Sequence, residues 1–266
     1  MKIIRFNALI LVSLLAVSGC ASLEGPTDPS DPFERYNRTM NTINNNLDRY
    51  VLKPVAKGYD TITPDPAQKG VSNFFSNLDD VLVIVNDLLQ FKFSQLASDT
   101  GRFVINSTLG VFGIFDWATD FGLKKHREDF GQTLGYWGVP SGPYFIMPLL
   151  GPSTIRDTGG LVVDTANFDP VVNEIDKRPP FPKRDGDTAL GLTALNVVNT
   201  RTRLLGASNL LEQMALDPYI FVREAYLQKR RNLVYDGNPP EEDFDEEEAL
   251  VVKQKPDPVL KEDRTR

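Results

Sequence analysis

The feature that most constrains this 266-residue chain is a run of 26 residues without a charged side chain, residues 130–155. A run of this length is enough for a helix to cross a lipid bilayer. Four prolines interrupt it, however, and a proline inside a helix removes a backbone hydrogen bond and clashes with the preceding turn. They are Pro140, Pro143, Pro148 and Pro152. The stretch is therefore too apolar for an ordinary surface loop and too interrupted for a membrane-spanning helix.

The N-terminus has the pattern of a secretory signal. Lys2 and Arg5 give it a positive end, and residues 8–17 contain a single polar side chain. This apolar run is too short for a permanent anchor, and small residues lead from it to Cys20, the only cysteine of the chain. The pattern resembles the bacterial lipoprotein signal, which predicts that residues 1–19 are removed and that Cys20 carries the lipid. The alternative is a short anchor or an ordinary signal, with the cysteine incidental.

The residues after the cysteine bear on where such a lipoprotein is sorted. The next residue is Ala21 rather than aspartate, and by resemblance to lipoprotein sorting this points to the outer membrane. Residues 20–30 are rich in Ser, Pro, Gly and Asp. We expect them to form a flexible tether.

The scarcity of cysteine and histidine limits the chemistry of the chain. One cysteine excludes a disulfide within the chain and a cysteine-based metal cluster. One histidine, His126, means that the commonest metal ligand and general base is nearly absent. His126 lies among charged side chains in residues 124–129, and a solvated charged face explains it better than a catalytic triad. We therefore predict no metal, no cofactor and no catalytic residue.

Motifs for nucleotide binding and acyl transfer are not met either. Gly131, Gly135 and Gly138 have the spacing GxxxGxxG without a preceding strand, which indicates turns rather than a dinucleotide loop. Ser141 lies in GVPSG, which is not the GxSxG of a nucleophile elbow. Neighbouring carboxylates such as Asp79 and Asp80 diverge on a helix, so no catalytic dyad is indicated.

The net charge of −7 is unevenly distributed. Residues 236–266 contain eleven acidic and five basic residues, and we predict that this acidic tail is disordered. Since the signal contributes +2 and the tail −6, the body is left with a net charge of −3. A body so close to neutral lacks the basic surface that nucleic-acid binding requires, so we predict no nucleic-acid partner.

The first helix is predicted to begin at Asp31, with Pro32 at the first helical position and Glu34 at the third. Apolar residues then recur at steps of three and four as far as Tyr50, which gives one apolar stripe. Pro54 is expected to end the helix. The opposite face carries the uncharged polar residues Asn37, Asn41, Asn44, Asn45 and Asn46.

Further helices are predicted at residues 72–90, after Ser94, after Ser153, at 188–205, from 208 and at 217–234. Residues 102–123 keep helical spacing but are apolar on almost every face, as in a helix buried in protein or lipid. A Pro-rich loop, residues 178–182, precedes the last helical region, in which Asp217 and Pro218 repeat the start at Asp31. No segment alternates with period two, so the predicted fold is all-α with long loops.

Two interpretations of the apolar residues are open. They form an ordinary globular core, or they meet lipid. Against the core stand the glycines and prolines of the apolar stretch and the predicted membrane tether, since irregular backbone at membrane depth is tolerated where protein buries it or where it lines a polar cavity. We therefore predict a ring-like assembly of amphipathic helices, embedded in the membrane, around long Gly/Pro-rich apolar loops and a passage. The candidate channel or lipid-contacting residues are Phe103, Phe112, Phe115, Trp117, Phe121, Tyr136, Trp137, Tyr144, Phe145 and Met147.

Five segments occur in order along the body: DPFERYNRTMN, LKPVAKGYDTITPDPAQKGVSNFFSNLDDV, RFVINSTLGVFGIFDWA, DFGQTLGYWGVPSGPYFIMPLLGPSTIRDTGG and DPYIFVREAYLQKR. Together they resemble the MlaA (VacJ) family of outer-membrane lipoproteins of Gram-negative bacteria. The resemblance extends from Asp31 to about Arg231, so residues 31–235 are predicted to form one MlaA-like helical domain.

The resemblance implies a helical ring embedded mainly in the inner leaflet of the outer membrane, on its periplasmic side. An amphipathic channel in such a ring takes phospholipid misplaced in the outer leaflet, and a periplasmic carrier, MlaC, receives it. Trimeric outer-membrane porins are the implied partners, and no covalent chemistry is involved. The asparagine face of the first helix and the aromatic loops are candidates for the polar and apolar walls of the channel.

Two other functions are alternatives to lipid transport. An outer-membrane lipid hydrolase is disfavoured, because no nucleophile motif is found. A non-transporting envelope scaffold is the remaining alternative, and the absence of stoichiometric phospholipid in the purified protein would favour it.

Overall fold

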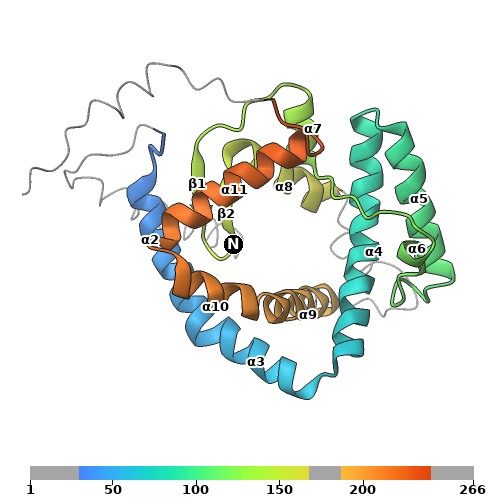
Figure 1. Cartoon of the computed structure of the whole chain (residues 1–266), viewed down its shortest axis with the longest axis horizontal. Coiled ribbons are helices and arrows are strands. Elements are labelled where there is room, and N and C mark those ends of the chain that lie inside the picture. The colour runs from blue at the N-terminus through green and yellow to red at the C-terminus, as the bar shows by residue number, and fades with distance from the viewer. Residues whose placement is uncertain (1–29, 168–186, 241–266) are drawn as a thin grey trace, which may run out of the picture.

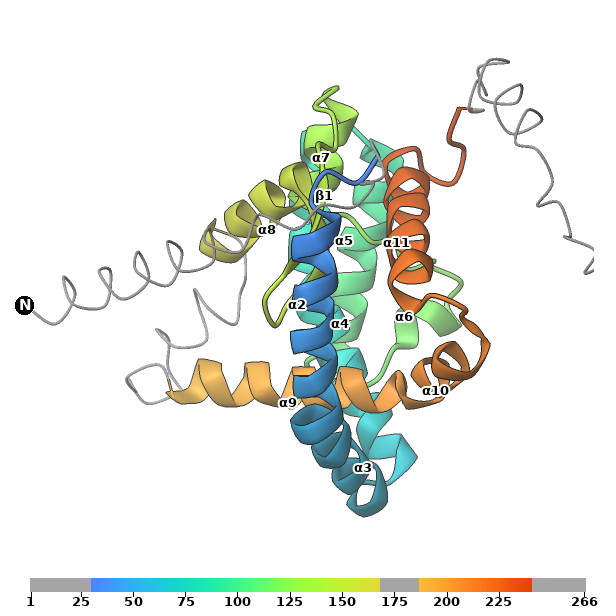
Figure 2. The ribbon, with the colours of Figure 1, turned by 90° about the vertical axis from the view of Figure 1, so that its left-hand side faces the viewer.

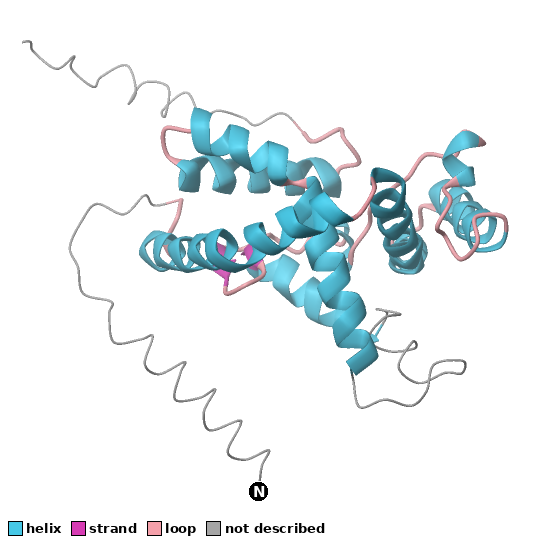
Figure 3. Ribbon diagram, turned by 90° about the horizontal axis from the view of Figure 1, so that it is seen from below, coloured by secondary structure: helices cyan, strands magenta, loops and turns pink. Residues whose placement is uncertain are grey.

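The computed structural model describes residues 30–167 and 187–240. The predicted signal peptide, Cys20, the Pro-rich loop at 178–182 and the acidic run at 241–248 lie outside the described residues. Within the described parts the fold is helical, as predicted, with one short hairpin (Figure 3).

The helices and strands follow one another around an open centre (Figure 1). The centre is bordered in turn by α4, α9, α10, α2, the hairpin, α11, α8 and α7. Helices α5 and α6 lie outside α4, and α3 lies outside α9. Seen from the side, α9 lies across the direction of α2 and α4 (Figure 2). The predicted ring-like arrangement of helices is therefore confirmed. The elements are α2 (Glu34–Leu47), η2 (Asp48–Leu52), α3 (Lys53–Ile62), α4 (Asp65–Leu89), α5 (Phe93–Thr108), α6 (Trp117–Asp120), α7 (Phe130–Tyr136), β1 (Tyr144–Met147), β2 (Gly151–Thr154), α8 (Ile155–Asn167), α9 (Asp187–Arg203), α10 (Leu205–Met214) and α11 (Pro218–Val234).

The first helix differs from the prediction at both ends. It begins at Glu34 without a side-chain cap, because Asp31 is buried and accepts hydrogen bonds from Asn37 and Tyr219 instead. The prediction that Pro54 ends it was wrong. The chain continues through the π-helix η2 into α3, where Pro54 lies in the first turn, and a proline there needs no backbone donor.

The predicted helix at 72–90 begins seven residues earlier, at Asp65, with Pro66 in its first turn. The helical spacing predicted across residues 102–123 also ends sooner, because α5 stops at Thr108. Val111, Phe112 and Gly113 then have positive φ angles of 51°, 57° and 88°, and this conformation turns the chain back toward α6.

A short hairpin with eight residues in strands departs from the predicted all-α pattern. Strands β1 and β2 pair antiparallel, with Tyr144 opposite Thr154 and Met147 opposite Gly151. They lie inside the uncharged run. Leu149 in the turn between them has φ 67°, and Gly151 at the start of β2 has φ 86°. Two strands of four residues each are too short to show period two in the sequence.

The C-terminal helices follow the predicted starts closely. The Asp217 side chain accepts hydrogen bonds from the backbone N–H groups of Tyr219 and Ile220, so the predicted cap of α11 is confirmed. At α8 the capping side chain is Thr154, which accepts from the Asp157 N–H at 3.2 Å, rather than the predicted Ser153.

Buried and partly buried ion pairs join neighbouring elements of the ring. The Arg230 guanidinium on α11 binds Asp129 before α7 and Asp157 on α8, with N–O distances of 2.9 Å to each. Burial raises the pKa values of both carboxyls, but the hydrogen bonds and charge of Arg230 outweigh it, so both pKa values lie below the usual range. Across the ring, Arg201 on α9 binds both carboxylate oxygens of Asp48, at 2.5 and 2.8 Å.

The distribution of side chains is the reverse of that in a water-soluble protein. Among the described residues only seven apolar or aromatic residues are buried, against 21 polar or charged ones, while 33 large apolar residues are exposed. In soluble proteins charged side chains are almost never fully buried, and a monomer rarely exposes large contiguous apolar patches. The small apolar core consists of Tyr144, Ile146 and Tyr219. No helix within residues 30–167 and 187–240 combines the length and apolar character that crossing a membrane requires.

Candidate functional site

Two cavities lie against the N-terminal half of α4. The first, of about 730 Å³, is lined mostly by polar and charged residues and is called the polar cavity. The second, of about 900 Å³, has mainly apolar walls and is called the apolar cavity. Residues from α4, from 125–128 and from α9 line the polar cavity, among them Lys69, Ser72, His126, Asn199 and Arg203. Residues from α4, from 114–120 and from α9 line the apolar cavity, among them Phe74, Ile114, Phe115, Trp117, Leu192 and Leu195.

The two cavities meet along α4. Lys69, Asn73 and Phe75 belong to the walls of both. Residues three, four and seven apart lie on one side of a helix, and α4 carries polar residues at this spacing beside its apolar stripe. A single amphipathic helix thus provides a polar wall for one cavity and an apolar wall for the other.

Hydrogen bonds fix α4 between its neighbours. The Asn73 amide donates to the carbonyl of Ile114 at 3.0 Å, which holds the 109–115 turn against the apolar cavity. Asn199 on α9 donates to Ser72 at 2.7 Å and accepts from Tyr59 of α3 at 3.2 Å. The walls of both cavities therefore come from elements that are tied to one another.

The segment 124–129 was predicted to be a solvated charged face, and the structure corrects this. Only Lys124 and Arg127 are exposed. Lys125 donates to the buried Asp80 and to the carbonyl of Ser76, the latter at 2.7 Å. His126 Nδ1 lies 2.8 Å from Asp99 Oδ2. Lys125, His126 and Glu128 thus pack inward, because the interior that they meet is itself polar.

Acidic groups gather behind His126. Glu128 is buried and accepts hydrogen bonds from Gln90 at 2.9 Å and from Lys92 at 3.0 Å. Asp87 and Asp99 are fully buried. Burial and the nearby charges of Asp99 and Glu128 raise the pKa of Asp87 to about 7. Asp79, by contrast, is exposed while Asp80 is buried, so these neighbours diverge as predicted.

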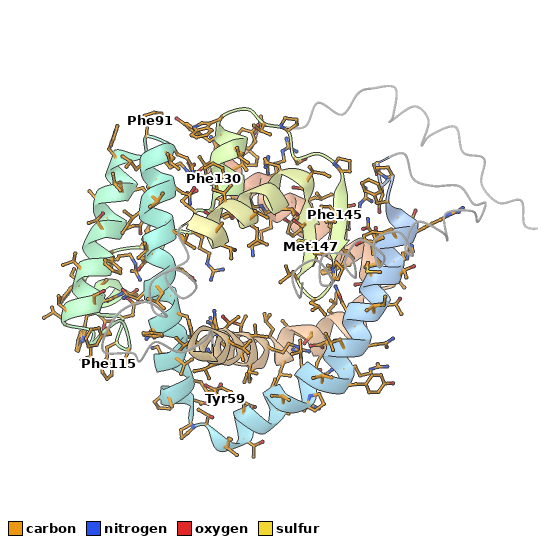
Figure 4. All side chains as sticks on the ribbon, turned by 180° about the vertical axis from the view of Figure 1, so that it is seen from behind. Tyr59, Phe91, Phe115, Phe130, Phe145 and Met147 are labelled. Carbon is orange, nitrogen blue, oxygen red and sulfur yellow. The ribbon has the colours of Figure 1, made fainter. Side chains whose placement is uncertain are left out.

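The ten candidate channel residues fall into three places. Five of them lie on α5, on α6 or in the segments next to α6: Phe103, Phe112, Phe115, Trp117 and Phe121. Of these five, Phe115 and Trp117 line the apolar cavity. Tyr136 and Trp137 lie at the other end of α4, where Trp137 donates to the carbonyl of Leu89 at 3.2 Å. Figure 4 shows these opposite ends, marked by Phe115 and Phe91. Tyr144, Phe145 and Met147 form β1.

Exposure separates the candidates further. Six are exposed: Phe112, Phe115, Trp117, Phe121, Tyr136 and Trp137. Phe103, Phe145 and Met147 are half-buried, and Tyr144 is 2% exposed. Burial raises the pKa of the Tyr144 phenol to about 12, so its hydroxyl stays neutral. The structure does not gather these residues around one passage.

Sequence reasoning missed the polar wall of the site. Gln68, Ser72, Asn73 and Asn199 lie on helices where single polar residues do not stand out. Two residues of the asparagine face of α2 do not form a free polar surface. Asn37 and Asn44 instead bind the backbone of the hairpin. Their separation of seven residues, which places them on one side of α2, was the available signal.

Comparison with known proteins gives a consistent set of relatives. The model of the family described as MlaA lipoprotein matches residues 29–233. The chain is 39% identical over 242 residues to the intermembrane phospholipid transport system lipoprotein MlaA of Escherichia coli, which covers 88% of this chain and 90% of that protein. It is 35% identical over 260 residues to the protein of the same name from Haemophilus influenzae, with 95% and 96% covered.

A solved structure is also similar. It is described by the words "Structural basis for maintenance of bacterial outer membrane lipid asymmetry". The match has a TM-score of 0.64 at 36% sequence identity, and covers 77% of this chain and 99% of the other. At this level of identity the similarity extends to both fold and sequence.

Proposed function

The chain belongs to the MlaA lipoprotein family, and from this premise we propose that it removes misplaced phospholipid from the outer leaflet of the outer membrane. The lipid passes through the protein toward the periplasm, which maintains the lipid asymmetry of the membrane. The process is transfer without covalent chemistry, so the protein is not an enzyme.

One observation carries this proposal. A polar cavity and an apolar cavity share the wall formed by Lys69, Asn73 and Phe75. A phospholipid has a polar head group joined to acyl chains, and each part requires surroundings of its own kind. The two adjoining cavities supply both on opposite sides of α4.

The reversed distribution of polar and apolar side chains supports a location in lipid. Exposed apolar residues cost free energy in water but not against acyl chains. We therefore propose that the ring lies mainly in the inner leaflet of the outer membrane and that acylated Cys20 anchors it there. The exposed candidates outside the apolar cavity, such as Phe112, Phe121 and Trp137, would contact the surrounding lipid. Phe103, Tyr144, Phe145 and Met147 stay predicted channel residues.

Two protein partners follow from family membership as proposals. A trimeric porin holds the ring in the outer membrane, and the periplasmic carrier MlaC receives the lipid. The alternative is a scaffold that binds envelope proteins and carries no lipid.

The experiment that tests transport uses a strain without the protein. We expect phospholipid to accumulate in its outer leaflet and wild-type protein to remove it. Phe115→Glu, which places a charge in the wall of the apolar cavity, should restore asymmetry poorly although the protein is present in the membrane. Phe112→Glu is the comparison variant, because Phe112 is exposed on the same turn but does not line the cavity. It should lower the amount of protein inserted in the membrane but not the transport per inserted molecule.

The outcomes separate transport from scaffolding. Normal asymmetry in the deletion strain would exclude the proposed function. Equal transport per inserted molecule in the two variants would exclude the apolar cavity as the acyl pathway. Purified wild-type protein should also carry phospholipid in native mass spectrometry, whereas a scaffold should carry none.

A further inference from the structure

Three cationic side chains line the polar cavity without an ion pair among the described residues: Lys69 on α4, Arg127 in the 124–129 segment and Arg203 at the end of α9. All three are exposed. A fourth cation of the wall, Lys125, is held by Asp80. The three unpaired cations come from three separate elements that face one cavity, so this is not a charged face of one helix.

The carboxylates of the same wall do not balance these charges. Glu128 is occupied by Lys92 and by glutamine side chains, and Asp79 has an interaction of its own. Asp65 lies in the first turn of α4, four residues before Lys69, and so offsets at most one of the three positive charges. The uncompensated charge of the polar cavity is therefore positive, which suits an anionic ligand.

We infer that Lys69, Arg127 and Arg203 bind the phosphodiester of the lipid head group in the polar cavity. This inference rests on the proposed function and deepens it. Arginine and lysine side chains form charge-assisted hydrogen bonds to phosphate oxygens. The acyl chains of the same lipid then lie toward the apolar cavity, across the wall that contains Lys69.

The charge of the cavity also sets a preference between head groups. Phosphatidylglycerol carries the phosphodiester charge alone, whereas phosphatidylethanolamine adds an ammonium group. That ammonium would meet the same uncompensated cations and be repelled. The cavity therefore selects head groups with a net negative charge over zwitterionic ones.

The test measures lipid binding by the full lipoprotein in detergent micelles. Native mass spectrometry compares phosphatidylglycerol, phosphatidylethanolamine and diacylglycerol with identical acyl chains. Wild-type protein should retain phosphatidylglycerol over phosphatidylethanolamine by about threefold or more, because each exposed cation contributes weakly and three act together. The triple variant K69Q/R127Q/R203Q should bind both phospholipids equally, with diacylglycerol binding unchanged.

Two controls complete the design. Lys124→Gln removes a neighbouring exposed cation that does not line the cavity, and it should keep the wild-type preference. Inorganic phosphate serves as a competitor, because a soluble phosphate has the same chemistry as the head group. Circular dichroism checks that each variant is as helical as the wild type.

Each outcome bears on one proposal. An unchanged preference in the folded triple variant, or none in the wild type, would overturn this inference and leave lipid transport standing. Displacement of the lipid by phosphate at submillimolar concentration would also overturn it, by assigning the cavity to a soluble anion. Wild-type protein that binds none of the three lipids would instead overturn the proposed function.

Discussion

The side-chain amide of Asn37 on α2 bonds the backbone of the hairpin on both sides of Phe145. Its Oδ1 accepts from the Ile146 N–H at 2.8 Å, and its Nδ2 donates to the Tyr144 carbonyl at 3.2 Å. Asn44 does the same with the Met147 carbonyl and the Leu149 N–H, both at 2.9 Å. Two amides of a helix thus take the place of a neighbouring strand along the free edge of β1 and satisfy backbone groups that burial would otherwise leave unpaired.

Asn37→Leu is expected to lower the stability of the ring. The replacement keeps the volume but leaves the N–H of Ile146 and the carbonyl of Tyr144 without partners in a buried site, at a cost of about 1–3 kcal/mol for each group. Thermal unfolding in detergent measures the effect. Asn45→Leu, on the exposed face of the same helix, should change the melting temperature little, and an equal loss in both variants would contradict the bridging role of Asn37.

Arg230→Met is expected to be more damaging. It leaves Asp129 without its cation and the buried Asp157 with Arg156 alone, and removal of one partner of a buried ion pair costs about 3–5 kcal/mol. The neighbouring Lys229 is exposed, so Lys229→Met is the control. Retention of wild-type stability in Arg230→Met would show that α11 is held to α7 and α8 by other contacts.

Asp87 should make stability depend on pH. Its pKa is raised from 3.8 to about 7 in the folded chain, so the folded state binds a proton more tightly than the unfolded state does. Ionisation of Asp87 therefore lowers the free energy of unfolding as the pH rises from about 4 to about 7, by at most about 4 kcal/mol. Below about pH 4 this loss is absent.

Asp87→Asn removes this titration, and the comparison with wild type isolates it. The difference in unfolding free energy between the two should change between pH 4 and pH 7, with the variant gaining relative to the wild type as pH rises. Asp120→Asn, at an exposed position, provides a reference. A constant difference across this range would mean that Asp87 is ionised throughout.

Two adjacent glycines of α8 should respond in opposite directions to alanine. A Cβ at Gly160 would lie 2.2 Å from the backbone nitrogen of Gly131 on α7, whereas a Cβ at Gly159 would meet nothing within 4 Å. Gly159→Ala should therefore stabilise the protein by roughly 0.5–1 kcal/mol through its helix propensity. Gly160→Ala should push α7 from α8 and lower the melting temperature. Similar shifts in the two variants would contradict the close approach of these helices.

Helix positions could be predicted from the sequence where local signals decide them. The cap at Asp217 with Pro218 in the first turn marks the start of α11 correctly, since both effects act within one turn. The continuation of the chain past Pro54 could not be predicted, because a π-helical insertion leaves no local signature. The role of Asp31 was missed for a similar reason, as its partner Tyr219 lies far away in the sequence.

The candidate site was less predictable than the fold. Large aromatic residues were predicted to line the channel, yet of these candidates only Phe115 and Trp117 line the apolar cavity. The polar cavity is built from ordinary residues such as Ser72 and Asn199, which meet only through the packing of α4 against α9. The spacing of residues within one segment cannot reveal a wall that is built from three separate segments.

The inverted placement of side chains has a consequence for how this protein tolerates sequence change. In a water-soluble enzyme, random variation is absorbed mostly at the periphery and is purged from the centre. Under the proposed location in lipid, a polar replacement at an exposed position such as Val104 or Leu161 should weaken the contact with acyl chains. An apolar replacement at a buried position such as Asn86 or Thr133 leaves the hydrogen-bonding groups of its neighbours without partners. A deep mutational scan of this chain should accordingly show low tolerance of polar residues at exposed positions and of apolar residues at buried positions, which is the opposite of the pattern in a soluble protein.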